Sequence, residues 1–208
     1  GGWHADGETH IPAPVEGTTP RVLTRKKDIE QVHICLAFPG VEQDDEDLYP
    51  ISVMNNLFGG GMSSRLFQRI REEMGAAYSV YSFPSTYTNC GTFTVYAGTS
   101  PETAQQVADE LLRQIRLLRD GGVTQEEFDM AKEQLKVSYV LGLESSSARM
   151  SAIGRSKLLR GHAVDPQDVI RKIEAVTKED VERAAHRMFG RPFSASAVGR
   201  NIDGLKLL

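Results

Sequence analysis

Large apolar side chains alternate with smaller or polar ones along segment 32–38. The apolar set is Val32, Ile34, Leu36 and Phe38. This period of two predicts a strand with one face toward a core, and the Pro-Gly pair that follows predicts its end. A second alternation over 193–198 predicts a closing strand. Between the two, aromatic and β-branched runs at 78–83 and 92–97 flank a Gly-containing turn and predict a β-hairpin.

Elsewhere the apolar residues recur at the three- and four-residue spacing of helices. Start signals precede four of the expected helices: Ser100 before Pro101, the capping-box pair Thr124 and Glu127, Asp165 before Pro166, and Thr177 before Asp180. The expected helices are 48–58, 64–75, 100–120, 124–142 and 146–159, with two shorter ones from Asp165 and Thr177. The order strand, helices, hairpin, helices, strand predicts an α+β fold, in which helices pack on one face of a mainly antiparallel sheet.

Composition excludes several classes of protein. The chain has 208 residues, of which 40% are hydrophobic and 25% charged, so neither a disordered tail nor a membrane protein is expected. Lys and Arg total 24 against 28 Asp and Glu, and this net charge of −4 argues against nucleic acid as a partner. The two cysteines, Cys35 and Cys90, are too few for a disulfide framework. A cytoplasmic protein without membrane contact is therefore expected.

The chain divides into three regions. Residues 1–20 begin with Gly-Gly-Trp and are rich in Gly and Pro without hydrophobic periodicity, which is typical of a linker. This linker suggests a downstream piece of a longer polypeptide, with a preceding half that is absent. Residues 21–200 are expected to form the folded domain, and residues 201–208 a tail.

Candidate chemistry is sparse in most of the chain. Zinc peptidases place two His on one helical turn beside a Glu, but neither HExxH nor HxxEH occurs here, and no metal site is expected. His33 is interpreted as a hydrogen-bonded packing residue. No GxSxG motif marks a nucleophile. The triglycine Gly59, Gly60 and Gly61 lacks the flanking residues of a phosphate loop, so a chain reversal or hinge is the preferred interpretation.

One segment, 59–82, has less ordinary chemistry. Arg65, Arg69 and Arg71 fall within two helical turns, and Tyr78 follows shortly after. If Gly75 ends the helix, Tyr78 begins the next strand and can lean back toward Arg71. A cation and a phenol that converge suit a peptide carbonyl, or the oxyanion formed when it is attacked. The alternative is a solvated Arg71 paired with Glu72 or Glu73, and a half-buried Tyr78.

The sequence GGGMSSRLFQRIREEMGAAYSVYS in this segment resembles the C-terminal half of the pitrilysin, insulysin and mitochondrial processing peptidase family. The resemblance is greatest to the short bacterial members. It extends from Thr18 to about Phe189 through separate stretches in the same order. These include RKKDIEQVHICLAFPG, TNCGTFTVYAGTS, KEQLKVSYVLGLESSSARM and AVTKEDVERAAHRMF.

The resemblance implies a specific role. Members of this family have two similar α+β halves that face each other across a closed chamber. The first half carries the HxxEH motif and the zinc, whereas the second supplies an Arg and a Tyr to the peptide substrate. By this likeness Tyr78 donates to the scissile carbonyl or oxyanion, Arg71 holds a nearby substrate carbonyl, and Gly59–Gly61 border the chamber.

The resemblance also limits the activity of this chain. It is expected to be the substrate-binding, chamber-closing half of a zinc endopeptidase, inactive without a zinc-bearing N-terminal half in the same polypeptide or another chain. A homodimer of the full-length protein is common among the bacterial members. The alternative is a non-catalytic scaffold subunit of the same fold. An RNA-binding sheet of the ferredoxin-like kind is disfavoured by the negative charge and the lack of a basic face.

Overall fold

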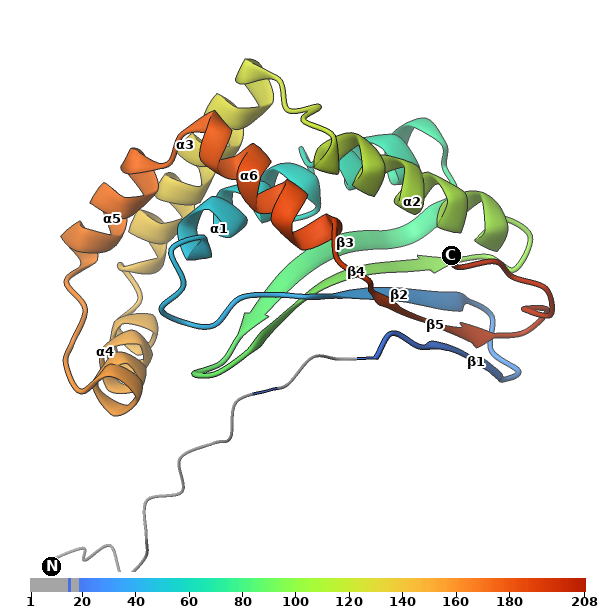
Figure 1. The fold of residues 1–208 in the computed structure, drawn as a ribbon, viewed down its shortest axis with the longest axis horizontal. Coiled ribbons are helices and arrows are strands. Elements are labelled where there is room, and N and C mark those ends of the chain that lie inside the picture. Colours follow the sequence, from blue (N-terminus) through green and yellow to red (C-terminus); the bar gives the residue numbers. More distant parts are fainter. Residues whose placement is uncertain (1–14, 16–18) are drawn as a thin grey trace, which may run out of the picture.

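A five-stranded sheet organises the fold, with the spatial order β1-β5-β2-β4-β3 (Figure 1). The computed structural model describes Val15 and residues 19–208. The strands are β1 (Val22–Lys26), β2 (Val32–Pro39), β3 (Ala77–Thr86), β4 (Gly91–Thr99) and β5 (Ser194–Gly199). Every neighbouring pair is antiparallel except β1 and β5, which are parallel. The predicted hairpin, closing strand and mainly antiparallel sheet are confirmed.

The edge strand β1 was not predicted, because its sequence carries no signal of a buried face. All five of its residues are exposed, so apolar and polar positions do not alternate along it. It pairs with β5 through the backbone, from Val22 opposite Ala195 to Lys26 opposite Gly199.

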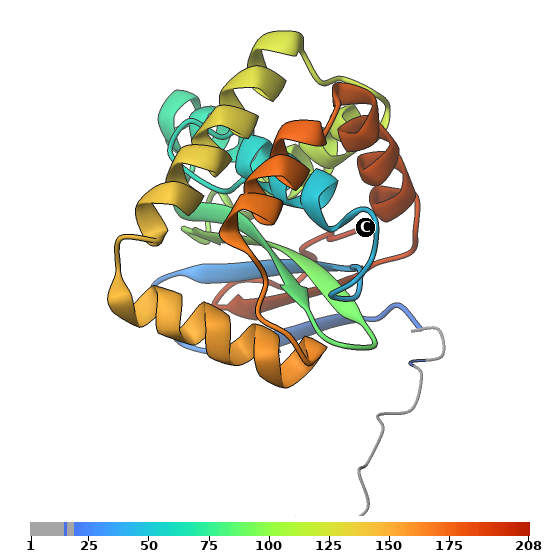
Figure 2. The ribbon, with the colours of Figure 1, turned by 90° about the vertical axis from the view of Figure 1, so that its left-hand side faces the viewer.

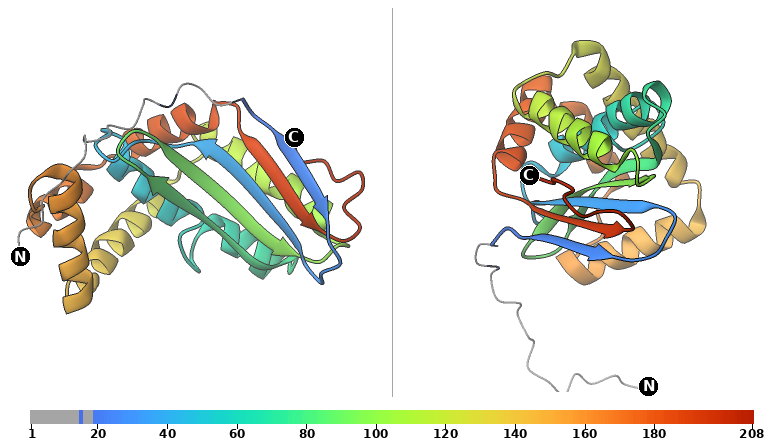
Figure 3. Two further views of the ribbon diagram at one scale, coloured as in Figure 1. Left: turned by 90° about the horizontal axis from the view of Figure 1, so that it is seen from below. Right: turned by 90° about the vertical axis from the view of Figure 1, so that its right-hand side faces the viewer.

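Helices cover one face of the sheet. They are α1 (Leu48–Phe58), the π-helix η1 (Phe67–Glu73), α2 (Ala104–Arg119), α3 (Gln125–Gly142), α4 (Ser146–Arg160), α5 (Pro166–Ala175) and α6 (Lys178–Phe189). The view from below in Figure 3 shows the opposite face of the sheet uncovered by any described helix. Helix α4 stands apart at one end of the sheet (Figure 2). The predicted α+β arrangement is therefore confirmed.

The core lies between the sheet and this helical layer. The alternating apolar side chains of β2 are fully buried there, as the pattern predicts. Phe38 of β2 contacts Phe189 of α6, with ring centroids 4.9 Å apart and the rings edge to face. The eight residues after 200, expected as a tail, contribute Ile202 and Leu207 to this core. The expected linker falls mostly on residues 1–14 and 16–18, outside the described part.

Helix starts follow the capping signals with one exception. The capping boxes at Thr124 and Thr177 both form, and Asp165 caps α5. The predicted start at Ser100 is wrong, because residues 101–103 form a turn and Thr103 precedes α2. The Thr103 hydroxyl bonds to the Thr99 hydroxyl and to the Ala76 carbonyl, which anchors this turn to the sheet.

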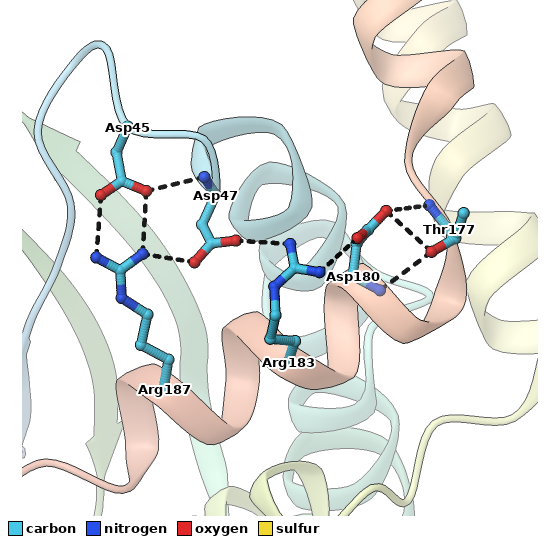
Figure 4. Close-up of polar contacts among 6 residues, drawn as sticks. All are labelled: Asp45, Asp47, Thr177, Asp180, Arg183 and Arg187. Carbon is cyan, nitrogen blue, oxygen red and sulfur yellow. Dashed lines mark hydrogen bonds and ion pairs between the residues drawn. The ribbon is translucent and has the colours of Figure 1, made fainter.

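A carboxylate–arginine network joins the start of α1 to α6 (Figure 4). The buried Asp47 carboxylate accepts hydrogen bonds from Arg183 Nη2 at 3.0 Å and from Arg187 Nη1 at 2.6 Å. Asp45 accepts from Arg187 and from the Asp47 backbone N–H. Charge-assisted bonds of this kind are roughly twice as strong as neutral ones, so the network fixes how the two helices cross.

Among the described helices, none combines the length and the apolar character that a membrane span needs.

Two further ion pairs hold η1 and the helical residues 65–66 directly before it in the helical layer. Arg65 makes a bidentate pair with Glu127 of α3, at 2.5 and 2.6 Å. Arg69 bonds Glu110 of α2 at 3.2 Å and Glu73 at 2.5 Å. Arg113 and Gln114 also donate to Glu110, which is buried. These donors, Arg113 foremost, lower the pKa of the Glu110 carboxyl to about 2.

The lowered pKa makes the stability of this network dependent on pH. Because the folded pKa lies below the ordinary value of 4.5, the Glu110 contribution is complete above about pH 5 and lost as pH falls toward 2. We expect this contribution to reach about 3 kcal/mol. Urea unfolding of Glu110→Gln should show a smaller loss of unfolding free energy between pH 5 and pH 2.5 than the wild type shows. Parallel pH curves would contradict the assignment, and the exposed Glu126→Gln serves as control.

Candidate functional site

The triglycine links α1 to the helix that contains η1 and lies against β3. The Gly59 carbonyl accepts a hydrogen bond from the Ser82 N–H at 3.0 Å. A Cβ on Gly59 would come within 2.5 Å of Ser82, and one on Gly60 within 2.8 Å of the Asn56 backbone. Gly61 has open space around it. The first two glycines are therefore required by close packing. Whether the triglycine acts as a chain reversal or a hinge stays a prediction.

The helix after this loop differs from the sequence expectation in its winding. The Met74 N–H bonds to the Arg69 carbonyl five residues earlier, at 3.2 Å, which defines a π-helical turn. Gly75 then adopts a left-handed φ of 59°, and the Ala76 N–H bonds back to the Ile70 carbonyl. The predicted helix end at Gly75 is confirmed. Single π-turns occur frequently at functional sites.

Arg71 is the arginine of this helix that is not held by a carboxylate. Its side chain is exposed, and its guanidinium lies over the Phe67 ring, 4.9 Å from the centroid. Among the described residues it forms no ion pair: Glu73 is bound to Arg69, and Glu72 does not contact Arg71 as an ion-pair partner. The alternative in which Arg71 pairs with Glu72 or Glu73 is therefore wrong. Arg71 keeps its charge and its hydrogen-bond donors available.

Tyr78 occupies a β-bulge at the start of β3. Ala77 pairs with Thr99 and Ser79 with Gly98, so Tyr78 is the extra residue between two consecutive pairs. Its side chain is 62% exposed, so the alternative of a half-buried Tyr78 is wrong. Bulges re-aim side chains and are common beside active sites. Neither the bulge nor the π-turn was predicted. The bulge depends on pairing with the distant strand β4, and the π-turn is a local i to i+5 hydrogen bond that the apolar spacing of a helix does not distinguish from a regular turn.

The structure brings the expected site residues onto neighbouring elements. Arg71 on η1 and Tyr78 on β3 are separated by one short link, and Ser82, which binds Gly59, lies four residues beyond Tyr78 on the same strand. At ~3.3 Å per residue this places Gly59 about 13 Å along the strand from Tyr78. In the described chain no hydrogen bond joins Arg71 to Tyr78, so both side chains can serve an external acceptor.

This arrangement can donate hydrogen bonds. Within residues 19–208 no three His, Cys, Asp or Glu side chains gather to hold a metal ion. His33 bonds the Tyr96 hydroxyl through Nδ1 at 2.7 Å, which confirms its interpretation as a hydrogen-bonded residue. His4 and His10 fall outside the described residues.

Comparisons with known proteins identify the family of the chain. Residues 3–135 match the domain described as "Peptidase M16 inactive domain". The chain is 40% identical over 176 residues to an uncharacterised zinc protease of Bacillus subtilis, covering 85% of this chain and 43% of the relative. It is 41% identical over 179 residues to another from Streptomyces coelicolor, covering 86% and 39%. The chain thus spans less than half the length of these relatives.

A solved structure shows the same fold. The peptidase M16 inactive domain from Pseudomonas fluorescens superposes with a TM-score of 0.79 at 24% identity, over 90% of this chain and 46% of that one. The resemblance to the non-zinc half of short bacterial zinc proteases is confirmed. This chain belongs to the peptidase M16 family, as its inactive domain.

Proposed function

We propose that this chain is the substrate-binding and chamber-closing half of a zinc-dependent endopeptidase that cleaves peptides or unfolded segments. An inactive M16 domain implies a catalytic half of the same fold family as its partner. The observation that carries the proposal is the pair of available donors, an unpaired guanidinium at Arg71 and a bulged, exposed phenol at Tyr78. A subunit that serves only as a scaffold has no use for keeping this pair free.

In this proposal the two side chains divide the work on the peptide. The Tyr78 hydroxyl donates to the scissile carbonyl and continues to donate as that oxygen becomes an oxyanion, which favours the transition state over the bound substrate. The Arg71 guanidinium holds a neighbouring carbonyl and sets the position of the peptide. The chemistry left to the other half is the activation of water by zinc.

Two surfaces support a contact with another half. The sheet face opposite the helices is bare in the described chain (Figure 3). In helix α4, Ser156 is the single buried residue, whereas Met150, Ile153 and Leu158 are exposed. A 15-residue helix is only marginally stable in water, so α4 requires packing against a further surface. We place α4 against the catalytic half.

The role of Tyr78 is tested by Tyr78→Phe in the intact protein with its catalytic half. Loss of one oxyanion donor should lower kcat/KM for a quenched fluorescent peptide by roughly 10- to 1,000-fold. Tyr87→Phe, which alters an exposed tyrosine near the β3–β4 turn, is the matched control. Kinetics unchanged by Tyr78→Phe would favour the scaffold alternative.

Arg71→Ala should act mainly on substrate binding. The side chain is exposed and holds no carboxylate, so the free energy of unfolding should change by less than ~0.5 kcal/mol. A lost charge-assisted hydrogen bond should raise KM about tenfold, with a smaller effect on kcat. Steady-state kinetics measure both constants, with the exposed Arg116→Ala on α2 as control. An unchanged KM would show that Arg71 is a solvated surface residue that does not bind substrate.

The contact at α4 is tested by Leu158→Ser, because Leu158 is 86% exposed in this chain. If the catalytic half covers it, the substitution should lower the urea-unfolding free energy of the intact protein by about 1–2 kcal/mol. Leu117→Ser on α2 should change it far less. Sedimentation of the same variants separates the alternatives. Dissociation of a dimer by Leu158→Ser would assign α4 to a homodimer contact. If Leu158→Ser changes neither the unfolding free energy nor the sedimentation, the proposed contact of α4 is wrong.

A further inference from the structure

The bare face of the sheet is chemically unusual for this chain. Strands β2, β3, β4 and β5 contain no Asp, Glu, Lys or Arg, although 25% of all residues are charged. The positions of these strands that face the helices form the core, so charged residues are not expected there. The absence of charged residues on the opposite face is unusual, because a surface that meets only water has no reason to exclude them.

Aromatic side chains gather on this uncharged face close to Tyr78. Tyr81 of β3 lies opposite Tyr96 of β4, with ring centroids 4.8 Å apart. Phe83, two residues further along β3, lies 6.0 Å from Tyr81. Tyr81 and Phe83 are 44% and 40% exposed. We call these three rings the aromatic strip.

The polar atoms beneath the strip are already satisfied. The Tyr96 hydroxyl forms hydrogen bonds with His33 Nδ1 and with the Ser79 side chain. A Cβ on Gly98 would lie 3.0 Å from the Ser79 hydroxyl and 3.1 Å from the Tyr96 hydroxyl, so glycine permits this arrangement. Burial raises the pKa of Tyr96 and of the neighbouring Cys35 thiol, which keeps both neutral. The strip therefore offers ring surfaces and no charge, with the Tyr81 hydroxyl as its exposed polar atom.

We infer that the aromatic strip is a specificity subsite that receives an aromatic or large apolar side chain of the peptide substrate. This inference rests on the proposed function. Tyr81 follows Tyr78 by three residues on one strand, about 10 Å along it. An extended peptide held at Tyr78 and running along β3 would place a side chain about three residues from the scissile bond over the strip.

The chemistry of the strip selects among side chains. Offset or edge-to-face contact with aromatic rings is worth about 0.5–1.5 kcal/mol beyond the burial of apolar area. A charged side chain at the same place would lose water without gaining an opposite charge, which is unfavourable. RNA-binding sheets also stack bases on aromatic residues, but they pair these with basic groups, which β2 to β5 lack. A peptide with an uncharged, bulky side chain is the occupant that fits.

The test compares peptides that differ at one position in the intact protein with its catalytic half. A quenched peptide series carries Phe or Glu at each of the positions two to four residues from the scissile bond, on either side. At one position the wild type should prefer Phe over Glu by at least ~10-fold in kcat/KM, and Tyr81→Ser with Phe83→Ser should reduce this ratio to about 2. Tyr87→Ser is the control. An unchanged ratio would overturn the inference.

A gain of function keeps the test independent of stability. Phe83→Arg places a cation on the strip and should raise kcat/KM for the Glu peptide about tenfold relative to the Phe peptide. An equal loss for all peptides, with a lower unfolding temperature, would show that the catalytic half covers the strip and would overturn the inference. If Tyr78→Phe slows cleavage while the strip variants leave preference intact, the subsite fails and the proposed function stands. If neither has an effect, both fail.

Discussion

The arrangement of the site depends on how carboxylates are shared among three arginines of one helix. Arg65 takes Glu127 and Arg69 takes Glu110 and Glu73, so η1 is tied to both α3 and α2. Both pairs are partly shielded from water. The pair of Arg65 is bidentate, and the Glu110 carboxylate bound by Arg69 has further donors, so both pairs are stronger than isolated surface pairs. Arg71 pairs with no carboxylate of the described chain, and its guanidinium lies over the Phe67 ring instead. The helix is thereby fixed in place while one of its cations stays available.

Three local irregularities follow one another directly after these anchors. The π-turn widens η1, Gly75 reverses the backbone with a positive φ, and the bulge inserts Tyr78 between two paired residues of β3. Regular helix or strand geometry would satisfy the same backbone more simply, and departures of this kind persist where surrounding packing fixes them. Here that packing includes the Gly59–Ser82 contact and the ion pairs of η1. The result is an exposed phenol on a rigid strand.

The sequence predicted what local periodicity and caps encode. Alternation identified β2, the hairpin and β5, and capping boxes identified α3 and α6, because these signals lie within a few residues. Strand β1 and the burial of Ile202 and Leu207 escaped prediction, since both depend on contacts with remote segments. Arg71 and Tyr78 were identified through the family resemblance; their spacing alone left a solvated interpretation open. Only tertiary pairing shows which of the three arginines lacks a carboxylate.

The two faces of the sheet differ in what covers them. One face buries large apolar side chains under helices that are locked by the Asp47 network (Figure 4). The other face is equally free of charge on β2 to β5 but has no cover in the described chain. Water favours charged residues on a permanently exposed sheet, so an uncharged bare face indicates a surface that meets something other than bulk water. In the function we propose, this surface meets a peptide held between two halves, and the exposed donor at Tyr78 and the aromatic ring at Tyr81 then contact the same peptide from one strand.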